Sequence, residues 1–155
     1  MKSWKSALRD GMVSGSAASL ATTLAVGVCG LREIGNAVAP INAVSHIAWG
    51  ESAAQADEFS AKHTLAGLAI NAAACYSWAV LYEEFFGEPA DGGDMKIAML
   101  GGAAVAGAAY VIDYHIVPKR LTPGFEKRLG CKSLIAIYSV LALSLGLSSL
   151  ARKKS

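Results

Sequence analysis

The sequence predicts an all-α polytopic membrane protein with four transmembrane helices and a short interfacial or re-entrant helix, at about residues 40–49, between the first and second. Hydrophobic residues make up 54% of the 155 residues and charged residues only 17%, whereas an ordinary soluble domain is about 25% charged. The mean hydropathy is +0.40. The charges are segregated, which leaves apolar runs at about residues 11–31, 64–85, 96–117 and 132–151. Because a helix rises about 1.5 Å per residue, about 20 residues cross a ~30 Å hydrocarbon core.

The four runs indicate one helical membrane domain over residues 1–155, without a repeat or a long linker. The alternative is a soluble all-helical bundle, in which four runs of this length rarely coincide. A capping-box pattern at Ser52–Gln55 predicts that the second long helix begins there and continues unbroken to Phe86. Thr122–Pro123 similarly predicts an early start for the last helix.

The first run has two interpretations. Lys2, Lys5 and Arg9 form a basic segment before it, and Ala25–Gly27 resembles a small-residue cleavage site, as in a signal peptide. A retained anchor is the preferred interpretation, because the apolar run continues past that site and further apolar runs follow. The chain has the style of small proteins of the bacterial inner membrane. The Lys and Arg residues divide seven against seven between the two sides, so the positive-inside rule does not decide the orientation. We expect both termini in the cytoplasm.

The stretch from Pro40 to Trp49 is too short to be a fifth crossing, since ten residues make about 15 Å of helix. A fifth crossing would nevertheless improve the charge asymmetry to nine against five. Read as a helix, the stretch carries Asn42, Ser45 and His46 on one face. We expect it to form a lid, with this polar face turned inward over the ends of the second and third spans. The alternative is that the face meets water and headgroups.

All three histidines fall on one side of a four-crossing bundle, together with a carboxylate about one turn inside the third span. The resulting candidate polar cluster is Asn42, Ser45, His46, His63, Asp113 and His115. His46, His63 and Asp113 are the candidate ligands of a transition metal, and a histidine pair could also hold haem, although no metal-ligand spacing such as H-E-x-x-H occurs. No cofactor is predicted outright. Asp113 needs a partner at that depth, and Arg32, Lys62 and a histidine are the candidates.

The opposite side carries an acidic second connection, with Lys96 to balance it. Its members are Glu83, Glu84, Glu88, Asp91 and Asp94. Because Gly and Pro residues surround them, we expect a solvated loop without a catalytic role.

Small residues four apart in two spans predict close helix packing, either within the chain or against a second copy or larger complex. These residues are Gly101, Gly102, Ala106, Gly107, Ala17 and Ala21. A basic stretch predicts contact with anionic lipids and not with nucleic acid; its residues are Lys119, Arg120, Lys127 and Arg128.

Three functions follow as expectations. The first is a non-enzymatic structural or accessory protein that acts through helix–helix contacts. The second is an interfacial binding or catalytic protein that uses the histidine and carboxylate cluster. The third is a small channel or transporter, which lacks support because no span has a charged residue near its middle and no span is broken by proline.

Overall fold

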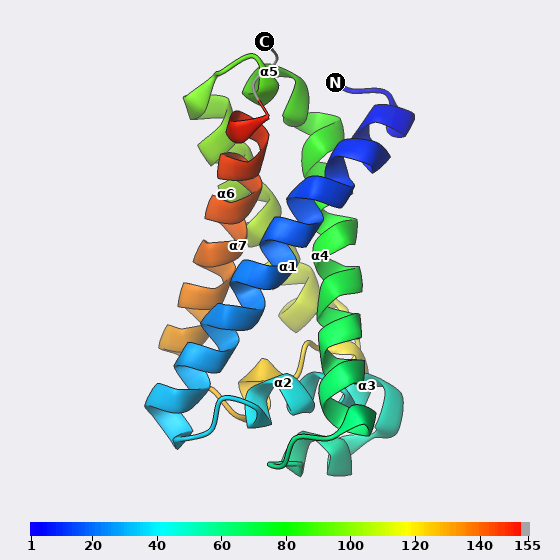
Figure 1. Ribbon diagram of the computed structural model, residues 1–155, viewed down its shortest axis with the longest axis vertical. Helices are drawn as coiled ribbons and strands as arrows, with labels where there is room; N and C mark the ends of the chain where they lie inside the picture. The colour runs from blue at the N-terminus through cyan, green and yellow to red at the C-terminus, as the bar shows by residue number, and fades with distance from the viewer. Residues whose placement is uncertain (153–155) are drawn as a thin grey trace.

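The computed structural model describes residues 1–152 and contains no strand within them. Its long helices are α1 (Trp4–Ile34), α4 (Ala66–Phe85) with the π-helical turn η2 (Ala61–Leu65) before it, α6 (Met95–Val111) with the π-helical turn η3 (Ile112–Ile116) after it, and α7 (Cys131–Ala151). Each of the four is long and apolar enough to cross a membrane. They form a bundle in which the start of α1, the end of α7 and α5 (Gly87–Asp91) lie at one end, which we call the terminal end (Figure 1). The other end, which holds the connection between α1 and α4, is called the lid end.

The first helix begins earlier than the apolar run that predicted it. Ser3 is its N-cap, and its side chain accepts a hydrogen bond from the backbone N–H of Ser6. Because nothing breaks the helix between Trp4 and Ile34, the charged residues at both of its ends belong to the same 31-residue element. The helix ends at Gly35 in the left-handed conformation, with φ of 69°. The other three spans start and end within three residues of the predicted bounds.

The first connection holds α2 (Ala39–Val44), α3 (His46–Trp49) and a 3₁₀ turn, η1 (Glu51–Gln55). The prediction of one long helix from Ser52 is wrong. The chain turns extended at Ala56 and starts a new helix at Ala61, where Ser60 is the N-cap and accepts from the backbone N–H of His63.

The third connection also differs from the prediction. It contains two 3₁₀ turns, η4 (Lys119–Leu121) and η5 (Phe125–Lys127), and α7 begins only at Cys131. Gly124 has a φ of 91°, which lies outside the range of a right-handed helix, so the helix cannot run continuously from Thr122.

Close helix contacts use glycine. A side chain at Gly15 would strike the ring of Tyr76 on α4, and one at Gly102 would strike the carbonyl oxygen of Ala142 on α7. Two apolar clusters form the core. One joins all four long helices, and the other joins the lid to the bundle through Val44 and Phe125.

Candidate functional site

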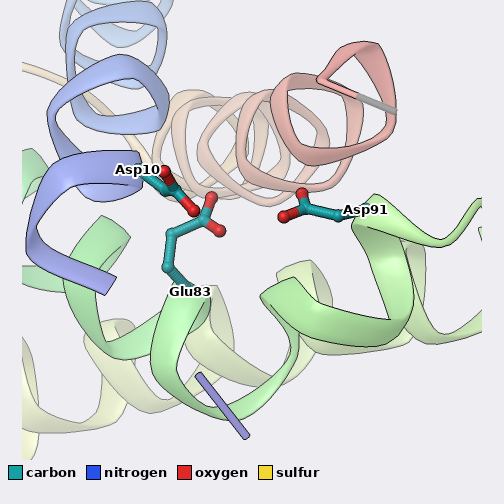
Figure 2. A group of neighbouring side chains, drawn as sticks. All are labelled: Asp10, Glu83 and Asp91. Carbon is teal, nitrogen blue, oxygen red and sulfur yellow. The ribbon is translucent and has the colours of Figure 1, made fainter. Parts of the chain in front are cut away.

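Three carboxylates from three elements meet inside the terminal end. Asp10 comes from α1, Glu83 from the last turn of α4 and Asp91 from the end of α5, and all three residues are buried (Figure 2). They offer ligand atoms within 4.8 Å of one another, so their geometry is compatible with a metal ion. The last turn of α4 and the short helix α5 are what carry Glu83 and Asp91 to the first turns of α1.

The ammonium group of Lys2 lies among these carboxylates. Its Nζ is 2.8 Å from Asp10 Oδ2, 2.7 Å from Glu83 Oε2 and 2.6 Å from Asp91 Oδ2. An ammonium has three N–H donors, and each carboxylate receives one contact. Burial alone would lower the pKa of Lys2, but hydrogen bonds to Asp10, Asp91 and Glu83 outweigh burial and raise this pKa above its ordinary value. The lysine therefore supplies the positive charge that a metal would bring.

Arg152, just after α7, binds two of these carboxylates through their other oxygens. Its guanidinium donates to Glu83 Oε1 and, at 3.3 Å, to Asp91 Oδ1. It also donates to Ser14 at 2.6 Å and to Ser149 at 3.2 Å, and these hydroxyls in turn donate to Glu83 and Asp91. We call the set Lys2, Asp10, Glu83, Asp91 and Arg152 the terminal clamp, because it fastens the first and last turns of the chain to α4 and α5.

The terminal clamp corrects the prediction of a solvated acidic loop. Glu83, Glu84 and Asp91 are only 0%, 5% and 7% exposed. Glu88 and Asp94 are exposed as predicted; Glu88 pairs with the N-terminal ammonium at 2.7 Å, and Asp94 accepts from the backbone N–H of Ile97 as the N-cap of α6. The sequence contained a usable signal, since any four-crossing topology places both termini beside the second connection.

At the lid end the polar face of α2 and α3 points inward, as the lid prediction requires. Asn42, Ser45 and His46 are fully buried. Asn42 donates to the carbonyl oxygens of Ala56 and Glu58, at 2.9 Å each, and accepts from Thr64 Oγ1 at 2.7 Å. It therefore ties the lid to the extended segment and to the start of the second span.

The two lid residues after Asn42 have local partners. Ser45 donates to the carbonyl oxygen of Asn42 at 2.7 Å. His46 Nδ1 lies 2.8 Å from the carbonyl oxygen of Ala43, and His46 Nε2 is buried without a hydrogen-bond partner.

The remaining members of the candidate polar cluster each have a neighbour of their own. His63 Nδ1 lies 3.2 Å from Ser60 Oγ, and the exposed ring of His115 packs 5.7 Å from that of Tyr110. Asp113 Oδ2 accepts from the hydroxyl of Tyr138 at 2.6 Å, in place of the expected pairing with Arg32, Lys62 or a histidine. Within residues 1–152, the side chains close enough to share a metal ion are those of Asp10, Glu83 and Asp91, and that group includes none of His46, His63 and Asp113.

The four basic residues assigned to anionic lipids divide into two pairs. Lys127 pairs with Glu51 at 2.8 Å, a hydrogen bond that lowers the pKa of Glu51, and Arg128 pairs with Asp57. Lys119 and Arg120 are exposed. Neither of these two takes part in an ion pair formed within residues 1–152.

The small residues of α6 divide in a similar way. Gly101 packs on Phe86, Gly102 packs on α7, and Ala106 is buried, so these three act within the chain. Gly107 is exposed, and a side chain there would meet nothing within 4 Å. On α1, Ala17 is exposed and Ala21 is half-buried.

Comparisons with known proteins give no family. No protein-family model, no curated protein and no solved structure matches the chain. The function is therefore argued from the geometry alone.

Proposed function

We propose that the protein is a non-enzymatic structural or accessory membrane protein that associates with another transmembrane helix through the outer face of α6 and α7. The observation that carries the proposal is the open position at Gly107. This glycine is exposed on a helix whose neighbouring outward residues Ala103, Ala104 and Ala108 are also small. A groove of about 310 Å³ runs beside it between α6 and α7, lined by Ala103, Ala106, Tyr110, Ile135, Ser139 and Ala142 among others.

The physical argument concerns what a membrane helix does with small residues. Lipid provides no hydrophobic drive for helix association, so close backbone approach over small residues is a main source of contact energy between helices. Gly101 and Gly102 already serve such contacts inside the chain. Gly107 and Ala103 offer the same kind of surface on the outside, where a second helix can use it.

The terminal clamp supports a structural role over a catalytic one. Its three carboxylates each contact Lys2, and Arg152 contacts two of them. Such saturated charges hold elements together, whereas a general acid or base needs a proton that it can exchange with a substrate.

We further propose that the four helices cross the inner membrane of a bacterium with both termini in the cytoplasm. Four apolar helices of sufficient length support the insertion. On this proposal the lid end faces the outer side of that membrane, and we expect the exposed residues Lys119 and Arg120 to contact anionic headgroups there.

The association is tested by photocrosslinking in membranes, with a crosslinking amino acid at Ala103 and, as the matched control, at the exposed residue Ala73 on α4. We expect a discrete protein adduct from position 103 alone, and its loss in Gly107→Leu. An adduct of twice 16.0 kDa identifies a second copy as the partner. Because an added Cβ at position 107 meets nothing within 4 Å, the thermal unfolding of Gly107→Leu should match that of the wild type. Lipid adducts alone at both positions, or a protein adduct that survives Gly107→Leu, would contradict the proposal.

A further inference from the structure

A small cavity lies beside Asp113, between α1, α4, η3 and α7. Its lining includes Thr22, Asn71, Trp78, Asp113, Phe125 and Tyr138, and its volume is about 50 Å³. A bound water needs about 10–15 Å³ of such space, so the cavity has room for a few water-sized groups. It goes beyond the proposed function, which uses the groove on the outside of α6 and α7, although Tyr138 lines both spaces.

The carboxylate in this cavity has a neutral partner only. Asp113 Oδ2 accepts from Tyr138, and Asp113 is absent from the ion pairs formed within residues 1–152. Glu126 is close enough to repel it, and Glu126 Oε2 is buried without a hydrogen-bond partner. A carboxylate that has no cation beside it near the end of a membrane span is energetically unfavourable. This site is therefore suited to receive a positive charge.

The walls of the cavity favour an organic cation. Trp78, Phe125 and Tyr138 line the same space as Asp113, and the faces of aromatic rings attract ammonium groups. Tyr138 is held in turn by Tyr110 and Tyr114, with ring centroids 5.5 and 6.0 Å away.

The backbone and the polar lining also suit a ligand site. Asp113 belongs to the π-helical turn Ile112–Ile116, and such turns often occur at functional sites. Asn71 donates its amide hydrogens to Thr22 and Thr23, at 3.3 and 3.2 Å, so the acceptor end of its side chain is its carbonyl oxygen. Residues that carry oxygen acceptors thus contribute to the lining from α1, α4 and η3.

We propose that this cavity binds a primary alkylammonium group, with Asp113 as its counter-ion. A primary ammonium presents three N–H donors, which match the carboxylate and neutral oxygens of the lining. The cavity has room for the few heavy atoms of an aminoethyl group. A quaternary ammonium carries a carbon on every bond and has no N–H to donate to these oxygens. The same chemistry occurs in the headgroup of an aminophospholipid and in a free alkylamine. Ala74, which also lines the cavity, is exposed on the outer side of α4.

The test measures thermal unfolding of the full chain in nanodiscs of phosphatidylcholine and phosphatidylglycerol. In one arm, ethylammonium or tetramethylammonium is titrated. In the other, phosphatidylethanolamine replaces phosphatidylcholine. We expect the unfolding temperature to rise with ethylammonium or with phosphatidylethanolamine and not with tetramethylammonium. A rise in the lipid arm alone identifies the lipid as the source, and a rise in the ethylammonium arm identifies a soluble amine.

The variant Asp113→Asn removes the counter-ion, and Glu58→Gln is its control, because it removes one exposed negative charge from the same end. We expect at least tenfold weaker binding in Asp113→Asn and unchanged binding in Glu58→Gln. If Asp113→Asn does not fold, Tyr138→Phe takes its place, since it keeps the ring and removes only the hydroxyl that orients Asp113; binding should weaken several-fold. The proposal is overturned if the wild type responds to neither amine source, or if the carboxylate or hydroxyl variant responds as the wild type does.

Discussion

At the scale of single residues, Lys2 shows how one charge can organise a buried site. Its ammonium contacts three carboxylates, and its side chain is only 7% exposed. Lys2→Met removes the cation and leaves those carboxylates with Arg152 and Arg9 only. Removing one partner of a buried ion pair typically costs about 3–5 kcal/mol, because an unpaired buried charge remains. We therefore expect a loss of this order in the free energy of unfolding, measured by denaturant titration in detergent micelles.

Arg9→Met is the matched control for Lys2→Met. Arg9 also pairs with Asp10, at 2.9 Å, but its side chain is 75% exposed, and exposed ion pairs contribute little. We expect Arg9→Met to cause no measurable change in the free energy of unfolding. Equal effects of the two variants would mean that the terminal clamp is a surface feature without a structural role.

At the scale of elements, the lid depends on a close backbone approach at Gly124. Gly124 has φ of 91°, and an added Cβ would lie 2.5 Å from the carbonyl oxygen of Ala43 and 2.9 Å from Nδ1 of His46. Gly35, which ends α1, is also left-handed, with φ of 69° and ψ of 14°, but it has open space around it. Both alanine variants carry the strain of a left-handed residue, about 1–2 kcal/mol, and only Gly124→Ala also pushes against α2.

We expect Gly124→Ala to lower the free energy of unfolding more than Gly35→Ala does. It should also speed amide hydrogen exchange in residues 39–49, because the lid loses its contact with the third connection. Matching exchange rates in the two variants would show that the lid does not depend on this contact.

At the scale of the whole molecule, the four helices and the lid make a topological prediction. Arg32 and Ser52 lie on either side of α2 and α3, and both are exposed at the lid end, as is the native Cys131. Cysteines at positions 32 and 52 should react with an impermeant reagent from the same side as Cys131. A cysteine at Lys96, in a background without the native thiols, should react from the opposite side. Reaction of positions 32 and 52 from opposite sides would mean five crossings.

The sequence by itself determined the helical class and the bounds of three apolar spans, and it led us to expect an inward polar face on the lid. These features depend on local properties: the length of an uncharged run and the period of a helix. The breaks at residues 56–60 and 122–130 were not predictable in the same way. Asn42 holds the first of them through backbone carbonyls of residues that no local pattern connects to it.

Only the tertiary structure decided which polar residues meet. Lys2 and Glu83 are 81 positions apart and Arg152 and Ser14 are 138 apart, so their contacts arise from the way the helices return to one end. The sequence grouped Asp113 with the histidines because they share a side of the bundle, but α7 places Tyr138 beside it instead. The side of the membrane on which a residue lies follows from its position along the chain. A partner within hydrogen-bonding distance depends on how each helix is rotated about its axis, and packing sets that rotation.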